Sequence, residues 1–193
     1  GDSVGHIANK HLLMEKLEHH SKALPLTQKI FELDPNDPAN IRDLARIYQR
    51  MGTDHIWLGE NAELNGDVAE ARSSFEKALP YHRKMYETVG QLVRLVPNDP
   101  ETKRYRSAGL MAYAETLGRN GQQTEALALA YECMKLANNF ETSDPNNREA
   151  KLGTAFANEI FAKIYGFSGD SNSAVKYTIR ALANFEEIFR GDN

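Results

Sequence analysis

Two rows of apolar residues flank the turn Gly66-Asp67, and they constrain the fold more than any other feature of this sequence. Both rows advance by alternating steps of three and four residues, which places each row on one face of an α-helix. The first row is Ile41, Leu44, Tyr48, Met51, His55, Leu58 and Ala62, and the second is Ala71, Phe75, Ala78, His82, Met85, Val89, Leu92 and Val96. We therefore expect two long antiparallel helices that pack on each other and on neighbours, because neither face can be buried alone.

Similar turns recur at Gly121 and Gly169, so the sequence contains an internal repeat. Counted from each glycine, alanine stands five residues later, a small residue twelve later, a small residue seven before and a large apolar residue eight before. The residues at these places are Ala71, Ala126 and Ala174; Ala78, Cys133 and Ala181; Gly59, Ala114 and Ala162; and Leu58, Tyr113 and Phe161. Small residues let two helices approach closely, so the first three alanines are predicted to be buried at helix contacts.

The segment Leu58-Gly59…Ala62…Gly66-Asp67…Ala71…Phe75…Ala78-Leu79 resembles the tetratricopeptide repeat (TPR), a helix-turn-helix unit of about 34 residues. The resemblance covers three hairpins and implies an all-α, right-handed, TPR-like solenoid of about seven helices in one domain, residues 1–193. Its expected parts are a partial repeat (1–38), a long hairpin (39–96), a second hairpin (97–143) and a third hairpin (144–193). The long arms are also similar to the repeat tails of some bacterial serine/threonine kinases and related signalling proteins.

Start and stop signals mark the ends of the seven helices. Asp37-Pro38 and Asp99-Pro100 each supply an N-cap followed by a first-turn proline, and Asp67 with Glu70 has the pattern of a capping box. The expected helices span about 7–33, 39–64, 68–96, 101–119, 123–139, 148–166 and 171–189, with a polar loop over 139–147. Pro25 and Pro80 fall inside the first and third helices, where we expect a kink and not an end.

Composition limits the classes of partner. The 193-residue chain carries a net charge of -4, which argues against a general affinity for nucleic acid or anionic membrane, because both need a dense positive field. No apolar run approaches the roughly 20 residues of a membrane span. The single cysteine, Cys133, cannot form an internal disulfide, and this favours a reducing, cytoplasmic compartment.

No motif for catalysis, metal binding or phosphate binding is present: the sequence lacks His-Glu-x-x-His, paired Cys-x-x-Cys and a glycine-rich phosphate loop. We therefore expect no enzyme activity, no cofactor and no metal site. Cys133 takes a small-residue repeat position and is expected to be a buried, inert thiol. His55 and His82 belong to the two apolar rows and should lie about one helical turn out of register. Surface positions are expected for His11, His19 and His20.

In the TPR family the first helices of the repeats line a concave groove that binds a peptide or a partner helix, so the resemblance implies a partner-binding groove here. The corresponding residues are Gln49, Thr53, Ile56, Trp57, Glu60, Met111, Glu115, Phe156, Glu159 and Lys163. Some members clamp a C-terminal carboxylate with Lys, Asn and Arg, but this set does not reproduce the clamp, so a chaperone-tail ligand is not expected. Trp57 is either an inter-helix packing residue or a partner-binding anchor.

Charge is segregated along the second helix. Arg42, Arg46 and Arg50 follow one another at four-residue spacing, and Glu60 and Glu63 lie further along. We add Arg46 and Arg50 to the candidate binding residues, because a basic and an acidic end would suit a partner of opposite polarity; the alternative is that these charges only solvate the helix. The sequence thus predicts a non-enzymatic protein-interaction scaffold with a peptide or protein partner. The alternatives are a structural module that forms homo-oligomers, or the regulatory tail of a larger signalling protein.

Overall fold

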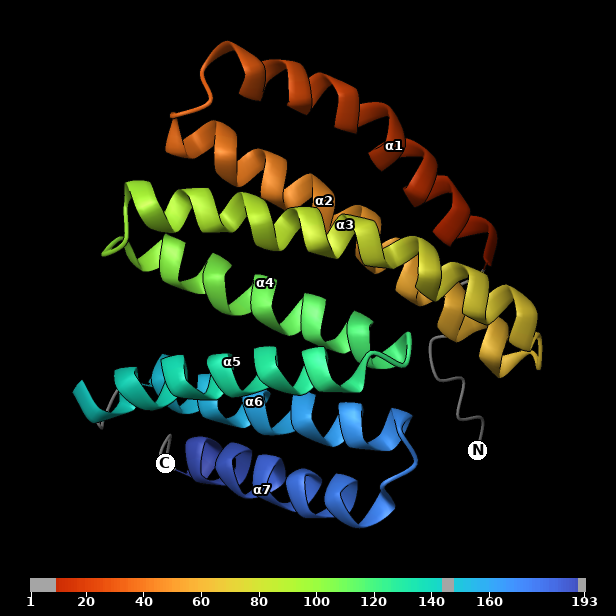
Figure 1. The fold of residues 1–193 in the computed structure, drawn as a ribbon, viewed down its shortest axis with the longest axis vertical. Helices are drawn as coiled ribbons and strands as arrows, with labels where there is room; N and C mark the ends of the chain where they lie inside the picture. The colour runs from red at the N-terminus through yellow and green to blue at the C-terminus, as the bar shows by residue number, and fades with distance from the viewer. Residues whose placement is uncertain (1–9, 144–147, 191–193) are drawn as a thin grey trace. The chain divides into compact units, whose positions relative to one another are not determined.

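The structure is a computed structural model that describes residues 10–143 and 148–190. These residues form seven α-helices and no strand, which confirms the all-α prediction for them (Figure 1). The helices are α1 (Lys10–Leu33), α2 (Pro38–Leu64), α3 (Val68–Leu95), α4 (Pro100–Arg119), α5 (Gln123–Ser143), α6 (Arg148–Phe167) and α7 (Ser171–Arg190). Both α1 and α3 continue through their prolines, Pro25 and Pro80, as expected.

Local side-chain chemistry explains where the helices begin. Four aspartates precede helices and accept a hydrogen bond from a backbone N–H of the first turn, which satisfies a donor that has no partner inside the helix. The bonds run from Ala39 to Asp37 (2.8 Å), Glu70 to Asp67 (2.9 Å), Thr102 to Asp99 (2.8 Å) and Ser173 to Asp170 (3.0 Å). The predicted caps at the starts of α2, α3 and α4 are therefore confirmed. The Glu70 side chain accepts a hydrogen bond from Lys10 of α1 (2.7 Å), a contact that the capping-box pattern did not predict.

Three inter-helix turns share one backbone geometry. Gly66, Gly121 and Gly169 have φ angles of 75°, 74° and 79°, in the left-handed region that favours glycine. In each turn the residue after the glycine donates its N–H to the carbonyl five residues back: Asp67 to Ala62 (2.9 Å), Gln122 to Leu117 (2.9 Å) and Asp170 to Tyr165 (3.0 Å). The repeat seen in the sequence is therefore also a repeat of local structure.

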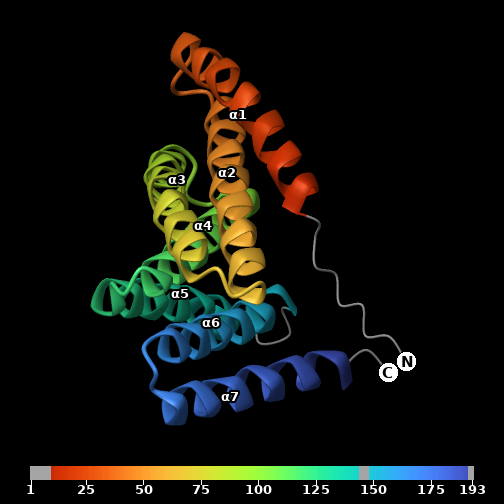
Figure 2. The ribbon, with the colours of Figure 1, turned by 90° about the vertical axis from the view of Figure 1, so that its right-hand side faces the viewer.

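The chain divides into two compact units, Gly1–Arg106 and Ser107–Asn193, and the division falls within α4. In the first unit, α2 and α3 form the long hairpin and α1 packs along α2 (Figures 1 and 2). Two rings of α3 lie directly against glycines of α2. A Cβ atom at Gly52 would lie 2.2 Å from the His82 ring, and one at Gly59 would lie 2.3 Å from the Phe75 ring. Only glycine accommodates these rings without a shift, which explains why α2 carries two glycines in its interior.

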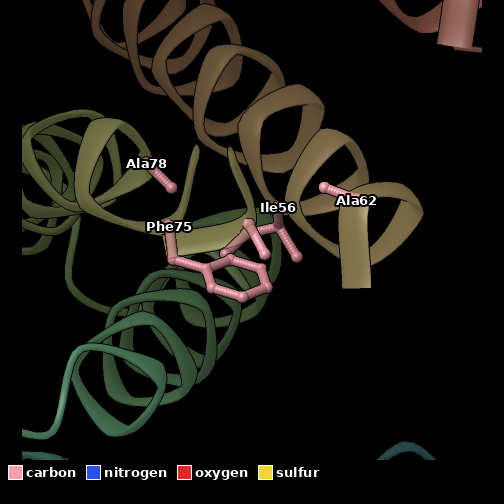
Figure 3. Close-up of a cluster of buried hydrophobic side chains, with 5 residues drawn as sticks. Ile56, Ala62, Phe75 and Ala78 are labelled. Carbon is pink, nitrogen blue, oxygen red and sulfur yellow. The ribbon is translucent and has the colours of Figure 1, made fainter. Parts of the chain in front are cut away.

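The two glycines and the two rings also define the register of the hairpin. Gly52 and Gly59 are seven residues apart, as are His82 and Phe75, so the antiparallel arms stay in step over two helical turns. His82 faces Gly52, three residues from His55, which agrees with the predicted offset of one turn between the two histidines. Near the end of the hairpin a buried cluster forms around Phe75 (Figure 3). Its members are Ile56, Ala62, Ala71, Phe75 and Ala78.

The core of the second unit lies among α4, α5, α6 and α7. Phe161 of α6 contacts Tyr131 of α5 edge-on and stacks on Tyr177 of α7, each with ring centroids 4.8 Å apart. Small residues bring the backbones close: the Cα of Gly118 faces Ile164 and Phe167, and Gly153 faces Ala137. The fully covered side chains of this unit include Leu110, Leu117, Phe161 and Ile164.

Two sequence predictions need correction, and one cannot be compared with the structure. Helix α5 continues to Ser143, although residues from 139 were expected to form a loop, because no glycine or proline interrupts the chain before Pro145. Ala71 and Ala126 are buried as predicted, whereas Ala174 is only partly buried. Ala174 lies on α7, and this helix buries fewer side chains than the helices of the long hairpin. The residues 7–9, which were expected to begin the first helix, lie outside the described residues.

Candidate partner-binding surfaces

The predicted binding residues of the first unit share one face of α2, here called the α2 surface. Its residues are Arg46, Gln49, Arg50, Thr53, Trp57 and Glu60. Their spacing of three or four residues turns them away from the buried row of the same helix, and all six are partly or fully exposed. Ile56, which the TPR resemblance also placed in the groove, is instead 7% exposed and belongs to the Phe75 cluster. Its expected role in partner binding is therefore wrong.

Two of the three arginines in the α2 row are already engaged within the first unit. Arg42 forms ion pairs with Asp99 (3.1 Å) and Glu101 (3.2 Å), at the start of α4. Arg46 donates two hydrogen bonds to the Tyr105 hydroxyl, at 3.1 and 2.9 Å. These contacts join α2 to the first turns of α4. Arg42 and Arg46 therefore have a packing role that their four-residue spacing did not predict.

Trp57 is the largest exposed side chain of the α2 surface, with 43% of its area accessible. The Nζ atom of Lys16, on α1, lies 5.4 Å from the centroid of its indole ring, in cation–π geometry. One part of the ring therefore contacts α1 and another part faces solvent. Trp57 thus packs in part against α1, as one sequence interpretation predicted, and it keeps an accessible aromatic surface; its role as a partner-binding anchor stays a prediction.

The predicted binding residues of the second unit form the α4–α6 surface: Met111, Glu115, Glu159 and Lys163. Lys163 lies between two carboxylates, 3.1 Å from Glu115 of α4 and 3.1 Å from Glu159 of α6. Burial alone would lower the pKa of Lys163, but the two carboxylates outweigh it and raise the pKa. Lys163 is therefore a firmly charged cation whose charge is already matched.

Two neighbours complete this surface. Arg119 forms an ion pair with Glu115 (3.3 Å), and its guanidinium lies 4.6 Å from the centroid of the Phe167 ring. Phe156, the remaining predicted groove residue, is 39% exposed and contacts Phe185 of α7 edge-to-face, with ring centroids 5.5 Å apart. Since Lys163 and Arg119 are both engaged by carboxylates of this chain, a ligand carboxylate would have to compete with them.

A histidine–aspartate pair between α1 and α2 was missed from the sequence. Nδ1 of His20 lies 2.5 Å from Oδ2 of Asp54, and Asp54 is only 2% exposed. The expectation that His20 is a surface residue is therefore wrong, because it is partly buried against α2. A signal was present: Asp54 lies seven residues after Ile47 and seven before Asn61, both buried, on the face of α2 that turns inward.

Burial shifts the pKa of one histidine in the long hairpin, His55, and of the cysteine in α5, Cys133. His55 stacks on Tyr81 with centroids 5.6 Å apart, and burial, with the nearby charge of Lys77, lowers its pKa. Cys133 is buried as predicted, and burial raises the pKa of its thiol to about 11. The thiol therefore stays protonated at neutral pH and is a poor nucleophile. Among residues 10–143 and 148–190, no three His, Cys, Asp or Glu side chains converge as metal ligands.

A pocket of about 490 Å³ opens between α5, α6 and α7. Aromatic rings form part of its wall, including Tyr131, Phe161 and Tyr177. On its polar side, the buried Asn158 donates a hydrogen bond to Oδ1 of Asn184 (3.0 Å). None of the predicted binding residues lines this pocket, so it is separate from the α4–α6 surface.

No protein-family model matches the chain, and no curated protein matches it. None of the helices described is both long and apolar enough to cross a membrane. Evidence about function therefore comes from the two surfaces themselves.

Proposed function

We propose that the chain is a non-enzymatic protein-interaction scaffold of the TPR type, which binds a peptide or a partner protein through the first helices of its hairpins. Three hairpin turns with the same glycine geometry support a repeat architecture. Repeat folds of this kind offer extended helical surfaces on which a partner can lie. The α2 surface and the α4–α6 surface are the proposed contact regions, each within its own unit.

Trp57 is the observation that carries the proposal. A tryptophan that is 43% exposed, on a helix face that otherwise presents Gln49, Thr53 and charged residues, leaves a large apolar area in contact with water. Covering it with a partner releases that water, and tryptophan is enriched among residues that dominate binding energy. The Lys16 ammonium lies 5.4 Å from the ring centroid, so a partner would contact the ring area that Lys16 leaves accessible.

The charged residues of the two surfaces indicate which kind of partner would fit. On the α4–α6 surface, Glu115 and Glu159 form ion pairs with Lys163 and Arg119, so this surface has little net charge. On the α2 surface, Arg46 is engaged with Tyr105, whereas Arg50 is exposed. A partner that combines an apolar side chain for Trp57 with a nearby acidic residue for Arg50 fits best, and a highly charged polymer fits poorly.

The test is affinity capture from the source cells by the full chain, followed by titration of the captured protein. Trp57→Ala should weaken binding by about 30-fold or more, as for a hot-spot residue, with an unchanged helical circular dichroism spectrum. The matched control is Phe189→Ala, which removes a largely exposed aromatic ring of α7 that belongs to neither surface. Equal binding by wild type and Trp57→Ala would refute the proposed site.

A photo-crosslinking residue gives an independent check. Placed at Thr53 of the α2 surface, it should label the captured protein. Placed at Arg72, an exposed residue of α3, it should not. Labelling from Arg72 alone would move the binding site to the second helices of the hairpins and would contradict the proposal.

A further inference from the structure

The pocket between α5, α6 and α7 lies wholly within the second unit and has two unlike ends. At one end three aromatic rings form the wall, because Phe161 contacts both Tyr131 and Tyr177 with ring centroids 4.8 Å apart. At the other end the side chains of Asn158 and Asn184 are joined by a hydrogen bond of 3.0 Å. The volume of about 490 Å³ falls within the range of small-molecule sites, roughly 300–1,000 Å³.

The two asparagines hold an unused acceptor and an unused donor side by side. Asn158 is only 5% exposed, and its Nδ2 atom donates to the carbonyl of Thr154 (3.1 Å) and to Oδ1 of Asn184 (3.0 Å). Among the described residues, nothing donates to Oδ1 of Asn158, and Nδ2 of Asn184 donates to no acceptor. A buried amide oxygen needs a hydrogen bond, so a ligand that donates to it is favoured there. A secondary amide, which carries an N–H beside a C=O, complements the pair.

Arg180 supplies the charge of this pocket. Its guanidinium lies 5.3 Å from the centroid of the Tyr177 ring, in cation–π geometry. Arg180 is exposed and forms no ion pair within residues 10–143 and 148–190, and no other charged residue of these ranges lines the pocket. One guanidinium matches the single charge and the planar shape of a carboxylate. A phosphate monoester, with a charge of roughly −1.5 to −2, would keep part of its charge uncompensated.

We propose that this pocket binds a small amphipathic carboxylate in which an apolar group, a secondary amide and the carboxylate are adjacent, as in an N-acylated apolar amino acid or the carboxyl-terminal residue of a peptide. The apolar group packs against the aromatic end. The amide N–H donates to Oδ1 of Asn158, its carbonyl accepts from Nδ2 of Asn184, and the carboxylate pairs with Arg180. The site shares no residue with the α2 surface or the α4–α6 surface, so it goes beyond the proposed partner binding and stands or fails independently of it.

The spacing of the lining residues suits a ligand of this size. Asn158 and Phe161 are three residues apart on α6, so the amide end and the aromatic end are separated by about 4.5 Å along the helix. On α7, Arg180 lies three residues after Tyr177 and four before Asn184, which makes it a neighbour of both on one helix face. In an N-acylated amino acid the side chain, the amide and the carboxylate all branch from one carbon atom, so one such residue can reach all three contacts.

An NMR titration of the full chain with N-acetylphenylalanine tests the pocket. Because the ligand is small, we expect a Kd of about 0.1–1 mM. The side-chain amide signals of Asn158 and Asn184 should shift together as the probe is added. N-acetylphenylalaninamide, which lacks the negative charge, should bind at least about 5-fold more weakly. No shift of these signals up to about 10 mM probe, or equal binding of the acid and the amide, would overturn the proposal.

A matched pair of variants tests the role of Arg180. Arg180→Ala should raise the Kd of N-acetylphenylalanine by about 5-fold or more and abolish the preference for the acid over the amide. The control is Lys176→Ala, which removes an exposed positive charge one turn earlier on α7 from a residue that does not line the pocket. It should change the Kd by less than about 2-fold. Both side chains are exposed, so the circular dichroism spectrum should stay unchanged. Equal weakening by the two variants would mean general charge attraction and would overturn the site.

The amide contact is tested from the ligand side, so that folding does not enter. The O-acetyl ester of 3-phenyllactate keeps the shape of N-acetylphenylalanine but replaces the N–H by an ester oxygen. It should bind at least about 5-fold more weakly, because that oxygen would face Oδ1 of Asn158 without a hydrogen bond. Equal binding of the ester and the amide probe would overturn the assignment of the asparagine pair.

A peptide separates the two sources of this chemistry. The probe is Gly-Ser-Gly-Ser-Gly-Phe with a free carboxyl terminus, compared with N-acetylphenylalanine in the same titration. A peptide that binds at least as tightly assigns the pocket to the carboxyl terminus of a peptide chain. Weaker binding of the peptide assigns it to a free acylated amino acid. Absence of binding by both probes would overturn the proposal.

Discussion

The α2–α3 hairpin and the α6–α7 hairpin have the same type of glycine turn, yet they bury their side chains very differently. In the first, rings of α3 press against glycines of α2, and the buried set even includes Asp54 and His82. In the second, α7 buries chiefly Ala181 and Ile188 and exposes an apolar stripe. The comparison teaches that turn chemistry specifies a hairpin, whereas the neighbours of the hairpin decide how much of it becomes core.

Truncation of one aromatic ring in each hairpin should give the largest difference in the free energy of unfolding between the two hairpins. Phe75→Ala removes the ring at the centre of the buried cluster of the long hairpin and should lower the free energy of unfolding by about 3–5 kcal/mol. Phe189→Ala removes an exposed ring of α7 and should change it by less than about 0.5 kcal/mol. Urea denaturation measures both. Similar losses for the two variants would mean that the hairpins are equally well packed.

Replacing the repeat alanines of α5 and α7 by a larger side chain allows the same comparison. Ala126→Leu should overpack the start of α5 and destabilise the chain by about 1–3 kcal/mol, because Ala126 is fully buried. Ala174→Leu, at the equivalent position of α7, should cost less than about 1 kcal/mol, because Ala174 is only partly buried. Melting temperatures followed by circular dichroism measure the difference. An equal fall in melting temperature in both variants would show that the two positions are equally buried.

Glycine replacement tests the close approach within the long hairpin. Gly52→Ala should be destabilising by about 1–2 kcal/mol net, because contact with the His82 ring outweighs the gain in helix propensity. The control is Gly90→Ala on α3, where a new Cβ would have its nearest neighbour, Nη1 of Arg94, at 3.8 Å. That variant should be stabilised by about 0.5–1 kcal/mol. If Gly52→Ala gained stability as well, the His82 ring would not be held against α2.

Sequence reasoning predicted the features that depend on neighbours along the chain. The seven helices, the aspartate caps and the glycine turns each follow from residues within a few positions of one another. The register of the long hairpin followed as well, because the length of the turn sets which residues face each other. Local signals do not show where a helix ends when no helix-breaking residue follows it, and α5 accordingly continues to Ser143.

The features that were missed depend on residues far apart in sequence. His20 and Asp54 are separated by 34 positions, and Arg46 and Tyr105 by 59. Spacing along one helix placed Arg42 and Arg46 on a face, but the identity of the side chains opposite them depends on how α4 packs. The candidate residues of α2 lie on an accessible face, except for Ile56, and their role in binding stays a prediction; the contacts that engage some of them could not be predicted.

The smallest expected effect concerns the caps of α4 and α7, and it appears only in acid. Asp99 accepts hydrogen bonds from the backbone N–H and the hydroxyl of Thr102 and pairs with Arg42, and these contacts lower its pKa. Asp170 accepts a backbone bond from Ser173, which lowers its pKa too, but it has no arginine partner in the described residues. When folding lowers the pKa of a carboxyl group, the carboxylate stabilises the fold at pH values above the usual pKa of 3.8. That stabilisation is lost as the pH falls through the pKa of the folded state.

Asparagine keeps the cap and removes the charge. Replacing Asp99 by asparagine should therefore reduce the loss of stability in acid more than replacing Asp170 by asparagine. Urea denaturation at a series of pH values down to about 3 measures this. Equal flattening in both variants would show that Arg42 adds nothing to the cap of α4, and that the first unit is not held together there by charge.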